Sequence, residues 1–194
     1  MPAPAHAPDL ERLERIAGRV RVCLACPLAA GRIQAVPGEG DARLGVVLVG
    51  EAPGRNEDET GRPFCGAAGR NLDLGLAEAG LTRADVFVTS VVKCRPPGNR
   101  DPTTEEKELC RQHLLAQLEA IQPRVVVALG RHGLHGILGG DPAADFAKLA
   151  GTFLQTPAGL PLWVSWHPAA IIYRQKWKPD YLRHWREFGA WLRA

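Results

Sequence analysis

The chain has 194 residues, of which 45% are hydrophobic and 23% charged, and its formal net charge at pH 7 is +3. This length and composition predict one globular domain with a sizeable core and argue against a disordered or fibrous protein. No stretch approaches the roughly 20 apolar residues of a membrane-spanning helix, so we expect a cytoplasmic monomer that does not bind membranes.

The N-terminal segment combines a polar lead with a helical pattern. Residues 1–8 lack the apolar core of a secretion signal and are predicted to be disordered, which leaves 9–194 as the domain. Residues 9–22 place apolar side chains at helical spacing, and Asp9 can cap the first turn. We therefore expect the domain to begin with a helix.

Two predicted strands follow, separated by an unusual stretch and a helix. Residues 44–50 form a continuous apolar run, which is typical of a strand buried on both faces. The stretch 50–69, GEAPGRNEDETGRPFCGAAG, is rich in glycine, proline and acidic residues, and it predicts neither a helix nor a strand. Residues 67–79 predict a helix that Gly80 ends, and residues 85–92 predict the next strand.

A loop and a long helix come next. Residues 93–102, KCRPPGNRDP, are predicted to be the loop. Residues 103–121 predict the helix, with Thr103 as its N-cap and Glu106 completing a capping box.

The last third predicts two more strands and two helices. RVVVALG, at 124–130, is a third buried strand, and residues 130–138 can form a short helix. Residues 139–151 predict a loop or weak helix, residues 160–166 a fourth strand, and residues 179–193 a final helix.

Strands that alternate with helices predict a single α/β domain in which helices flank a four-stranded parallel sheet. In such sheets the active crevice lies beyond the carboxyl ends of the strands. GEAPG at 50–54, KCRPPGNR at 93–100 and WHPAA at 166–170 each follow a strand. We therefore expect these three segments to meet in space.

The GEAPG segment can present both backbone donors and a carboxylate. Gly50 and Gly54 allow a tight turn that Pro53 stiffens, and such a loop can point N–H groups at one oxygen. Glu51 would stand at the mouth of the crevice, where a carboxylate can orient water or face a developing cation. A tight turn with a surface glutamate is the alternative interpretation.

Two further side chains are candidates for binding and catalysis. Phe64, placed after a polar loop, could stack on a planar ligand such as a base, or it could belong to the core. His167 follows a strand and could donate a hydrogen bond to an oxygen that gains negative charge, although lone histidines are more often structural.

Four of the five cysteines can form one ligand set: Cys23, Cys26, Cys94 and Cys110. Disulfides are not expected in a reducing compartment. Both tetrahedral zinc and a [4Fe–4S] cluster suit four thiolates, and the fifteen-residue separation of the second pair favours the cluster modestly. Cys65 would remain a free thiol.

Basic residues gather near the C-terminus, between residues 171 and 194. This pattern allows contact with a polyanion, and a solvated helix face explains it equally well.

Several of these stretches together resemble family 4 uracil-DNA glycosylases, the iron–sulfur branch of their superfamily. The resemblance rests on GEAPGRNEDETGRPFCGAAG, VVKCRPPGNRDPTTEE, the upstream CLAC and the late WHPAAIIYR, and it runs from Cys23 to the final helix. It implies a single α/β domain with a four-stranded parallel sheet, and a [4Fe–4S] cluster on Cys23, Cys26, Cys94 and Cys110. It also implies an enzyme that removes uracil from single- or double-stranded DNA and so begins repair of deaminated cytosine.

The resemblance also assigns roles around a uracil that is flipped out of the DNA. Phe64 would stack on the base, Glu51 would stabilise the sugar cation and position water, and His167 would stabilise the departing uracil through O2. The remaining uracil-binding positions are Gly50, Ala52 and Gly54, through backbone N–H groups, and Ser90. Family members usually carry asparagine where this chain has Ser90, whose hydroxyl can make only part of the amide's hydrogen bonds; we therefore expect weaker discrimination or a slower rate.

Residues near the cluster loop and in the WHPAAIIYR segment are expected to contact DNA. An apolar side chain would wedge into the duplex as the base leaves, and basic side chains would contact phosphates. The predicted contacts are Lys93, Arg95, Arg100, Ile171, Ile172, Tyr173 and Arg174.

Three alternatives are less favoured. A homologue that binds uracil covalently carries a KRRIH-type insertion, whereas KCRPPGNRDP here holds no histidine. A non-catalytic zinc or iron–sulfur protein that only binds nucleic acid has no need of both Glu51 and His167 at strand ends. A Rossmann-type enzyme would show GxGxxG after the first strand, and this chain does not.

Overall fold

The computed structural model describes residues 7–140 and 145–194. Residues 1–6 of the predicted N-terminal lead, and part of the predicted loop at 139–151, lie outside these ranges. No helix in the described ranges has the length and apolar character needed to cross a bilayer.

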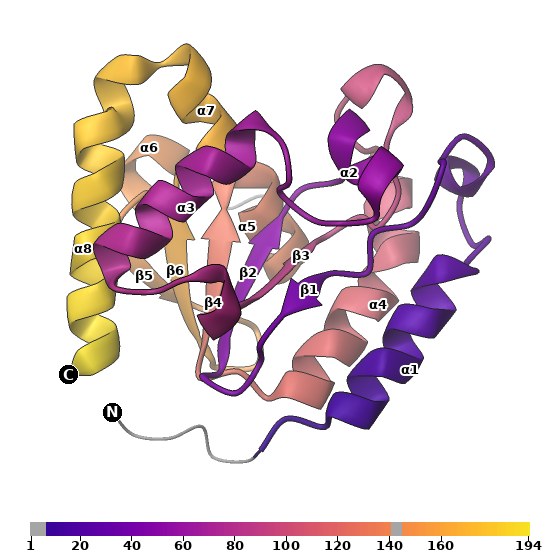
Figure 1. Ribbon diagram of the computed structural model, residues 1–194, viewed down its shortest axis with the longest axis horizontal. Helices are drawn as coiled ribbons and strands as arrows, with labels where there is room; N and C mark the ends of the chain where they lie inside the picture. The colour runs from indigo at the N-terminus through magenta and orange to yellow at the C-terminus, as the bar shows by residue number, and fades with distance from the viewer. Residues whose placement is uncertain (1–6, 141–144) are drawn as a thin grey trace.

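The fold places helices on both faces of one sheet (Figure 1). The strands are β1 (Glu39–Gly40), β2 (Val46–Gly50), β3 (Phe87–Ser90), β4 (Val125–Leu129), β5 (Phe153–Gln155) and β6 (Pro161–Ser165). The α-helices are α1 (Leu10–Arg21), α2 (Arg55–Thr60), α3 (Ala67–Ala79), α4 (Thr104–Ile121), α5 (Gly130–Leu138), α6 (Phe146–Leu149), α7 (Pro168–Tyr173) and α8 (Lys178–Arg193). Short 3-10 turns are η1 (Pro27–Ala30), η2 (Arg83–Asp85), η3 (Pro97–Asn99) and η4 (Gln175–Trp177).

The sheet has six strands in the order β1-β3-β2-β4-β6-β5. The four inner strands, β3, β2, β4 and β6, are parallel, as predicted. The expectation of a purely parallel four-stranded sheet is nevertheless wrong, because β1 and β5 add antiparallel edges. Each edge strand is only two or three residues long, too short to show an alternating pattern in the sequence.

Alternate residues of the inner strands enter two separate cores. Val46 and Leu48 of β2 pack in the core under α3 and α8, which includes Trp185. Val47 and Val49 pack in the core under α1, α4 and α5. Burial on both faces explains why these strands are continuous apolar runs.

The predicted helix ends are confirmed. The Asp9 carboxylate accepts a hydrogen bond from the Arg12 N–H, and Thr103 and Glu106 cap α4 reciprocally. Gly80 ends α3 with a φ of 74°, a conformation that favours glycine.

Helix α2 corrects the expectation that residues 50–69 contain no helix. Glu57 accepts a hydrogen bond from the Gly54 N–H at 3.0 Å, which satisfies a free donor at the start of the helix. Gly61, with a φ of 73°, ends the helix after six residues. Such a short polar helix carries no apolar periodicity by which a sequence pattern could reveal it.

Candidate active site

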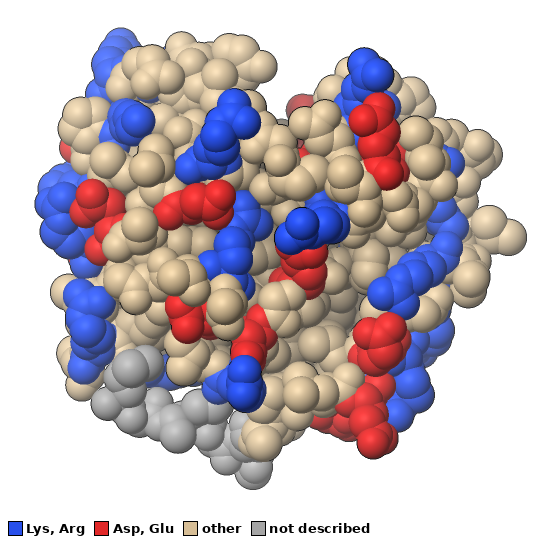
Figure 2. All heavy atoms as spheres, in the orientation of Figure 1, with Lys and Arg blue, Asp and Glu red and all other residues tan. Residues whose placement is uncertain are grey.

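A cavity of about 350 Å³ opens beyond the carboxyl ends of the parallel strands. Its walls include Glu51 after β2, Ser90 at the end of β3, Asp101 after η3 and His167 after β6. Figure 2 shows the surface notched at the top of the view, the end toward which the inner strands point in Figure 1. The expectation that the three unusual segments meet in space is confirmed.

Glu51 is a partly buried carboxyl whose environment disfavours its ionised form. Burial, and secondarily the negative charge of Asp101, raise the pKa of Glu51 to about 7, while Lys107 acts in the opposite direction. Because the folded protein holds this proton more tightly than the unfolded chain, ionising Glu51 costs folding stability as the pH rises from 4.5 to about 7. A carboxyl poised near neutrality suits a catalytic role.

His132, at the start of α5, lies between the two carboxyl groups, and sequence reasoning missed it. Its Nε2 is 3.4 Å from the Asp101 carboxylate, and its Nδ1 is 4.0 Å from that of Glu51. The Lys107 ammonium lies 3.4 Å from Nδ1. Burial and the Lys107 charge lower the pKa of His132, so the ring is neutral at pH 7. The one feature of the sequence that could have identified His132 as a site residue is its position just after the buried strand predicted at 124–130.

His167 is a neutral imidazole in this structure. Its Nδ1 accepts a hydrogen bond from the Ala169 N–H at 3.1 Å, which caps α7 and leaves the proton on Nε2. Burial, and secondarily His132, lower the pKa of His167 to about 4. The ring therefore remains a neutral donor throughout the physiological range.

Phe64 lies 5.8 Å from His167, measured between ring centroids. Its φ of 51° is left-handed, which costs backbone energy for a bulky residue. A Cβ on Gly50 would lie 2.6 Å from the Phe64 ring, so a glycine is required beneath it. A Cβ on Gly69 would lie 1.8 Å from the Phe64 carbonyl oxygen. These two glycines leave room for the strained residue.

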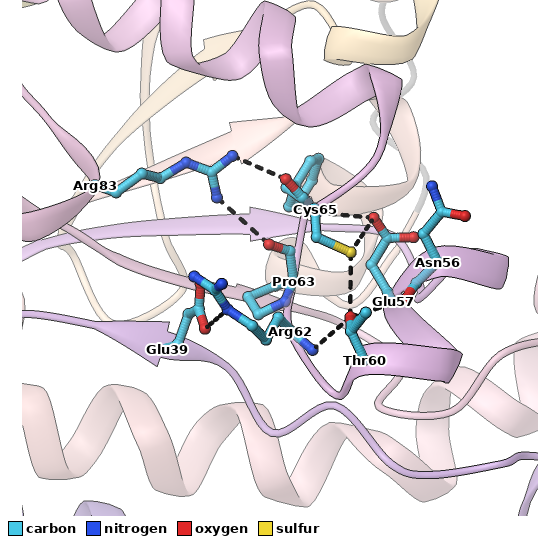
Figure 3. A network of polar contacts seen from close by, with 9 residues as sticks. Glu39, Asn56, Glu57, Thr60, Arg62, Pro63, Cys65 and Arg83 are labelled. Atoms are coloured by element: carbon cyan, nitrogen blue, oxygen red, sulfur yellow. Dashed lines mark hydrogen bonds and ion pairs between the residues drawn. The ribbon is translucent and has the colours of Figure 1, made fainter.

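Two charged residues that sequence reasoning did not single out hold the Phe64 backbone in place (Figure 3). The Glu57 carboxylate accepts hydrogen bonds from the N–H groups of Gly54, Cys65 and Gly66. The Arg83 guanidinium donates to the Phe64 carbonyl oxygen at 2.9 Å. Glu57 thus joins the GEAPG loop to the loop that carries the aromatic ring.

Cys65, which was expected to remain a free thiol, is exposed. Its sulfur lies 3.2 Å from the Thr60 hydroxyl oxygen and 3.6 Å from the Glu57 carboxylate (Figure 3).

The expected uracil-binding residues differ in whether their hydrogen-bonding groups are free to contact a ligand in the cavity. Ser90 is buried and lines the cavity. The Gly54 N–H donates to the Glu57 carboxylate at 3.0 Å, so in this structure it is engaged within the protein. In the described part of the chain, the Ala52 N–H has no protein acceptor, and Ala52 lines the cavity.

The four cysteines of the expected ligand set gather beside the N-terminal half of α4. Cys94 and Cys110 are buried, and Cys26 packs against the same core. The sulfur of Cys23 lies 3.3 Å from Nε2 of His113. In the described residues, the ligand atoms of no three cysteines lie within 4.8 Å of one another. Four thiols gathered at one place are a donor set that both tetrahedral zinc and a [4Fe–4S] cluster can use.

Two of the thiols, those of Cys94 and Cys110, accept hydrogen bonds from nitrogen donors and have pKa values raised by burial. Arg32 donates to the Cys94 sulfur at 3.0 Å, and the Lys93 N–H donates to the Cys110 sulfur at 3.3 Å. Burial raises the pKa of Cys110 to about 11 and raises that of Cys94. These thiols therefore keep their protons at neutral pH unless a metal displaces them.

Two expected DNA contacts are excluded by burial. Lys93 is 1% exposed, and Ile171 is 0% exposed and packs in the core with α3 and α8. Neither side chain can reach a phosphate or wedge into a duplex. The lysine was misjudged because it stands in a polar, basic loop sequence.

The other expected DNA contacts lie at or near the surface. Tyr173 is 85% exposed and lines the cavity mouth, Ile172 is half-buried, and the Arg174 guanidinium lies over the Trp177 ring. Arg95 donates to the Asn99 side chain. Arg100 makes a two-fold ion pair with Glu106, which engages its guanidinium.

Ion pairs neutralise much of the basic C-terminal segment. On α8, Arg183 pairs with Asp180 and Glu187, and Arg186 pairs with Glu78. Figure 2 shows this side of the molecule, at the left, with acidic and basic side chains interspersed. The solvated helix face is the better interpretation for α8.

A family model described as the uracil DNA glycosylase superfamily matches residues 37–189. The chain belongs to this superfamily. A type-4 uracil-DNA glycosylase of Archaeoglobus fulgidus is 40% identical, over 93% of each chain. A type-4 enzyme of Pyrobaculum aerophilum is 43% identical, over 84% of this chain and 85% of the relative. A type-5 uracil-DNA glycosylase of the same organism is 38% identical over 70% of this chain.

These similarities place the chain in the type-4 branch of the superfamily, in agreement with the resemblance seen in the sequence.

Replacing Asp101 should lower the pKa of Glu51. In Asp101→Asn the negative charge beside Glu51 is lost, so the Glu51 carboxyl should titrate below about 7. Carbon-detected NMR of labelled glutamate side chains measures this midpoint. Glu105→Gln, an exposed change in the first turn of α4, is the matched control and should leave it unmoved. An equal midpoint in Asp101→Asn and the control would contradict the assigned cause.

Proposed function

We propose that this protein excises uracil from DNA by hydrolysing its N-glycosidic bond, leaving an abasic site and starting repair of deaminated cytosine. Membership of the type-4 branch supports the reaction. One observation supports it at the level of the site: Glu51, Phe64 and His167 line a common cavity. The protein acts as a monomer on single- or double-stranded DNA.

The substrate base enters the cavity after it is flipped from the stack, because the glycosidic bond inside a duplex is out of reach. Phe64 offers its ring as the stacking surface. Since Glu57 and Arg83 fix the backbone around that ring, the surface exists before the base arrives.

Cleavage leaves negative charge on the departing uracil. His167 donates from Nε2 to uracil O2, and its neutral state suits a donor that stabilises an anion without transferring its proton. The Ala52 N–H supplies a second donor at the same end of the cavity.

The sugar becomes electron-poor as the bond breaks. An ionised Glu51 stabilises that charge and holds the attacking water. Its carboxyl must lose a proton held with a pKa of about 7 in the empty site. His132 and Asp101 border Glu51, and they complete the polar wall that faces the water.

A [4Fe–4S] cluster on Cys23, Cys26, Cys94 and Cys110 is part of the proposal. The donor set of four thiols and the nearby N–H groups suit it. When bound, the cluster supplies a cross-link among the segment after α1, the loop after β3 and α4. No step of the reaction at Glu51 and His167 requires it.

Residues at the mouth of the cavity contact the DNA outside the flipped base. In this proposal Tyr173 and Ile172 fill the space left by the flipped base, and Arg95 and Arg174 contact phosphates; all four side chains are at least partly exposed. A protein that only binds nucleic acid would not need Glu51, a carboxyl with a raised pKa, in the same cavity as His167, a neutral histidine.

Release of uracil tests the reaction directly. A uracil-containing oligonucleotide treated with the protein and then with alkali should break at the uracil. Glu51→Gln and His167→Asn should each slow cleavage by about 10²–10⁴-fold, with Glu105→Gln unchanged. For the wild type, kcat/KM should rise as the pH increases through about 7, because Glu51 ionises. Undiminished cleavage by Glu51→Gln would refute the assigned roles.

Ser90 provides a test of base selection. An asparagine amide can both accept from uracil N3–H and donate to O4, so Ser90→Asn should raise the rate on uracil and the preference over cytosine. Rates on matched uracil- and cytosine-containing strands measure both effects. Equal rates and selectivity in the variant and the wild type would show that position 90 does not read the base.

Metal content tests the cluster. Anaerobically purified protein should be brown, with visible absorption and four irons per chain, and Cys110→Ser should reduce the iron content. Cys65→Ser is the matched control and should retain it, because Cys65 lies outside the ligand set. One tightly bound zinc per chain in place of iron would overturn this part of the proposal.

A further inference from the structure

Lys93 occupies a position that its sequence did not predict. Its side chain is among the largest fully buried ones in the molecule, at 1% exposure. Its ammonium donates to the Thr89 hydroxyl at 2.6 Å, to the Ser90 carbonyl oxygen at 2.6 Å and to the Gln117 side-chain oxygen at 2.7 Å. Three acceptors match the three donors of a charged ammonium.

All three acceptors are neutral oxygens, so none balances the positive charge. A buried charge without an anionic partner is costly, and folded proteins normally pair it. A negative charge close to Lys93, beyond these three acceptors, would therefore stabilise its ammonium.

The cysteine ligand set is adjacent to Lys93. Its backbone N–H donates to the Cys110 sulfur at 3.3 Å, and Cys94 is the next residue in the chain. Four thiolates around a [4Fe–4S] core carry net negative charge. That charge is brought to the site when the cluster binds.

The same lysine reaches the cavity. Through the Ser90 carbonyl oxygen it holds the carboxyl end of β3, whose Ser90 side chain lines the proposed uracil site. Lys93 thus spans the distance between the cysteines and the base-binding residues.

We propose that Lys93 is the internal counter-cation of the cluster and a positioning residue that links cluster occupancy to the end of β3. The inference rests on the cluster of the proposed function. With the cluster bound, its charge offsets that of the buried ammonium. Without it, the buried ammonium beside Ser90 loses that offset.

The test compares cluster-loaded and cluster-free protein in four forms: wild type, Lys93→Met, Thr89→Val and Lys148→Met. Methionine keeps the length of the side chain and removes its charge. Thr89→Val removes one hydrogen-bond acceptor of Lys93 but leaves its charge. Lys148→Met is the matched control and removes the charge of an exposed surface lysine. The readouts are the rate of iron release to a chelator under anaerobic conditions and the thermal unfolding midpoint of each form.

Lys93→Met should release iron roughly tenfold faster than the wild type, because a nearby cation no longer attracts the cluster. Its stabilisation by the cluster, measured as the difference in midpoint between loaded and free protein, should shrink. Thr89→Val should lower both midpoints by similar amounts, and Lys148→Met should change neither readout.

Equal losses of stability in loaded and cluster-free Lys93→Met, with an unchanged release rate, would overturn the proposal and leave Lys93 as a hydrogen-bond donor only. If Lys93→Met does not fold, Lys93→Gln takes its place, since glutamine retains a donor. Failure of both variants to fold with or without iron would also overturn it, because the polypeptide itself would then need the charge. Wild-type iron content and uracil release, measured first, separate these outcomes from failure of the cluster or of the glycosylase activity.

Discussion

One carboxylate organises the end of the sheet on which the proposed chemistry depends. Glu57 accepts hydrogen bonds from Gly54, Cys65 and Gly66, so a single side chain ties the turn after β2 to the loop before α3. Phe64, between these anchors, can then keep a left-handed backbone that a bulky residue would otherwise avoid. Without that hydrogen-bond network, neither the Phe64 ring nor the turn that presents Glu51 would have a defined position.

The surroundings of the cavity shift the pKa values of Glu51 and His167 in opposite directions. Burial and Asp101 raise the pKa of Glu51, whereas burial and His132 lower that of His167. One group can therefore gain or lose a proton near neutrality while the other stays a neutral donor. This separation of pKa values is what a reaction that develops a cation and an anion side by side would use.

Much of this architecture could be predicted from the sequence, because it depends on local patterns. Buried strands such as Val46–Gly50 appear as apolar runs, and the caps at Thr103 and Gly80 carry their own side-chain chemistry. Glu57 could not be distinguished from the other acidic residues of its loop, because its role depends on three N–H groups brought together by folding. Lys93 was placed at the surface because nothing local reveals that Thr89 and Gln117 would surround it with acceptors.

The short outer strands have a consequence for behaviour at high concentration. β1 and β5 are antiparallel to their neighbours, and each has only two or three residues whose backbone groups could pair with a strand of another molecule. Long exposed edges invite another sheet to add on, which begins aggregation. By closing both borders of the parallel strands with such brief segments, the fold leaves little template for edge-to-edge pairing with another sheet.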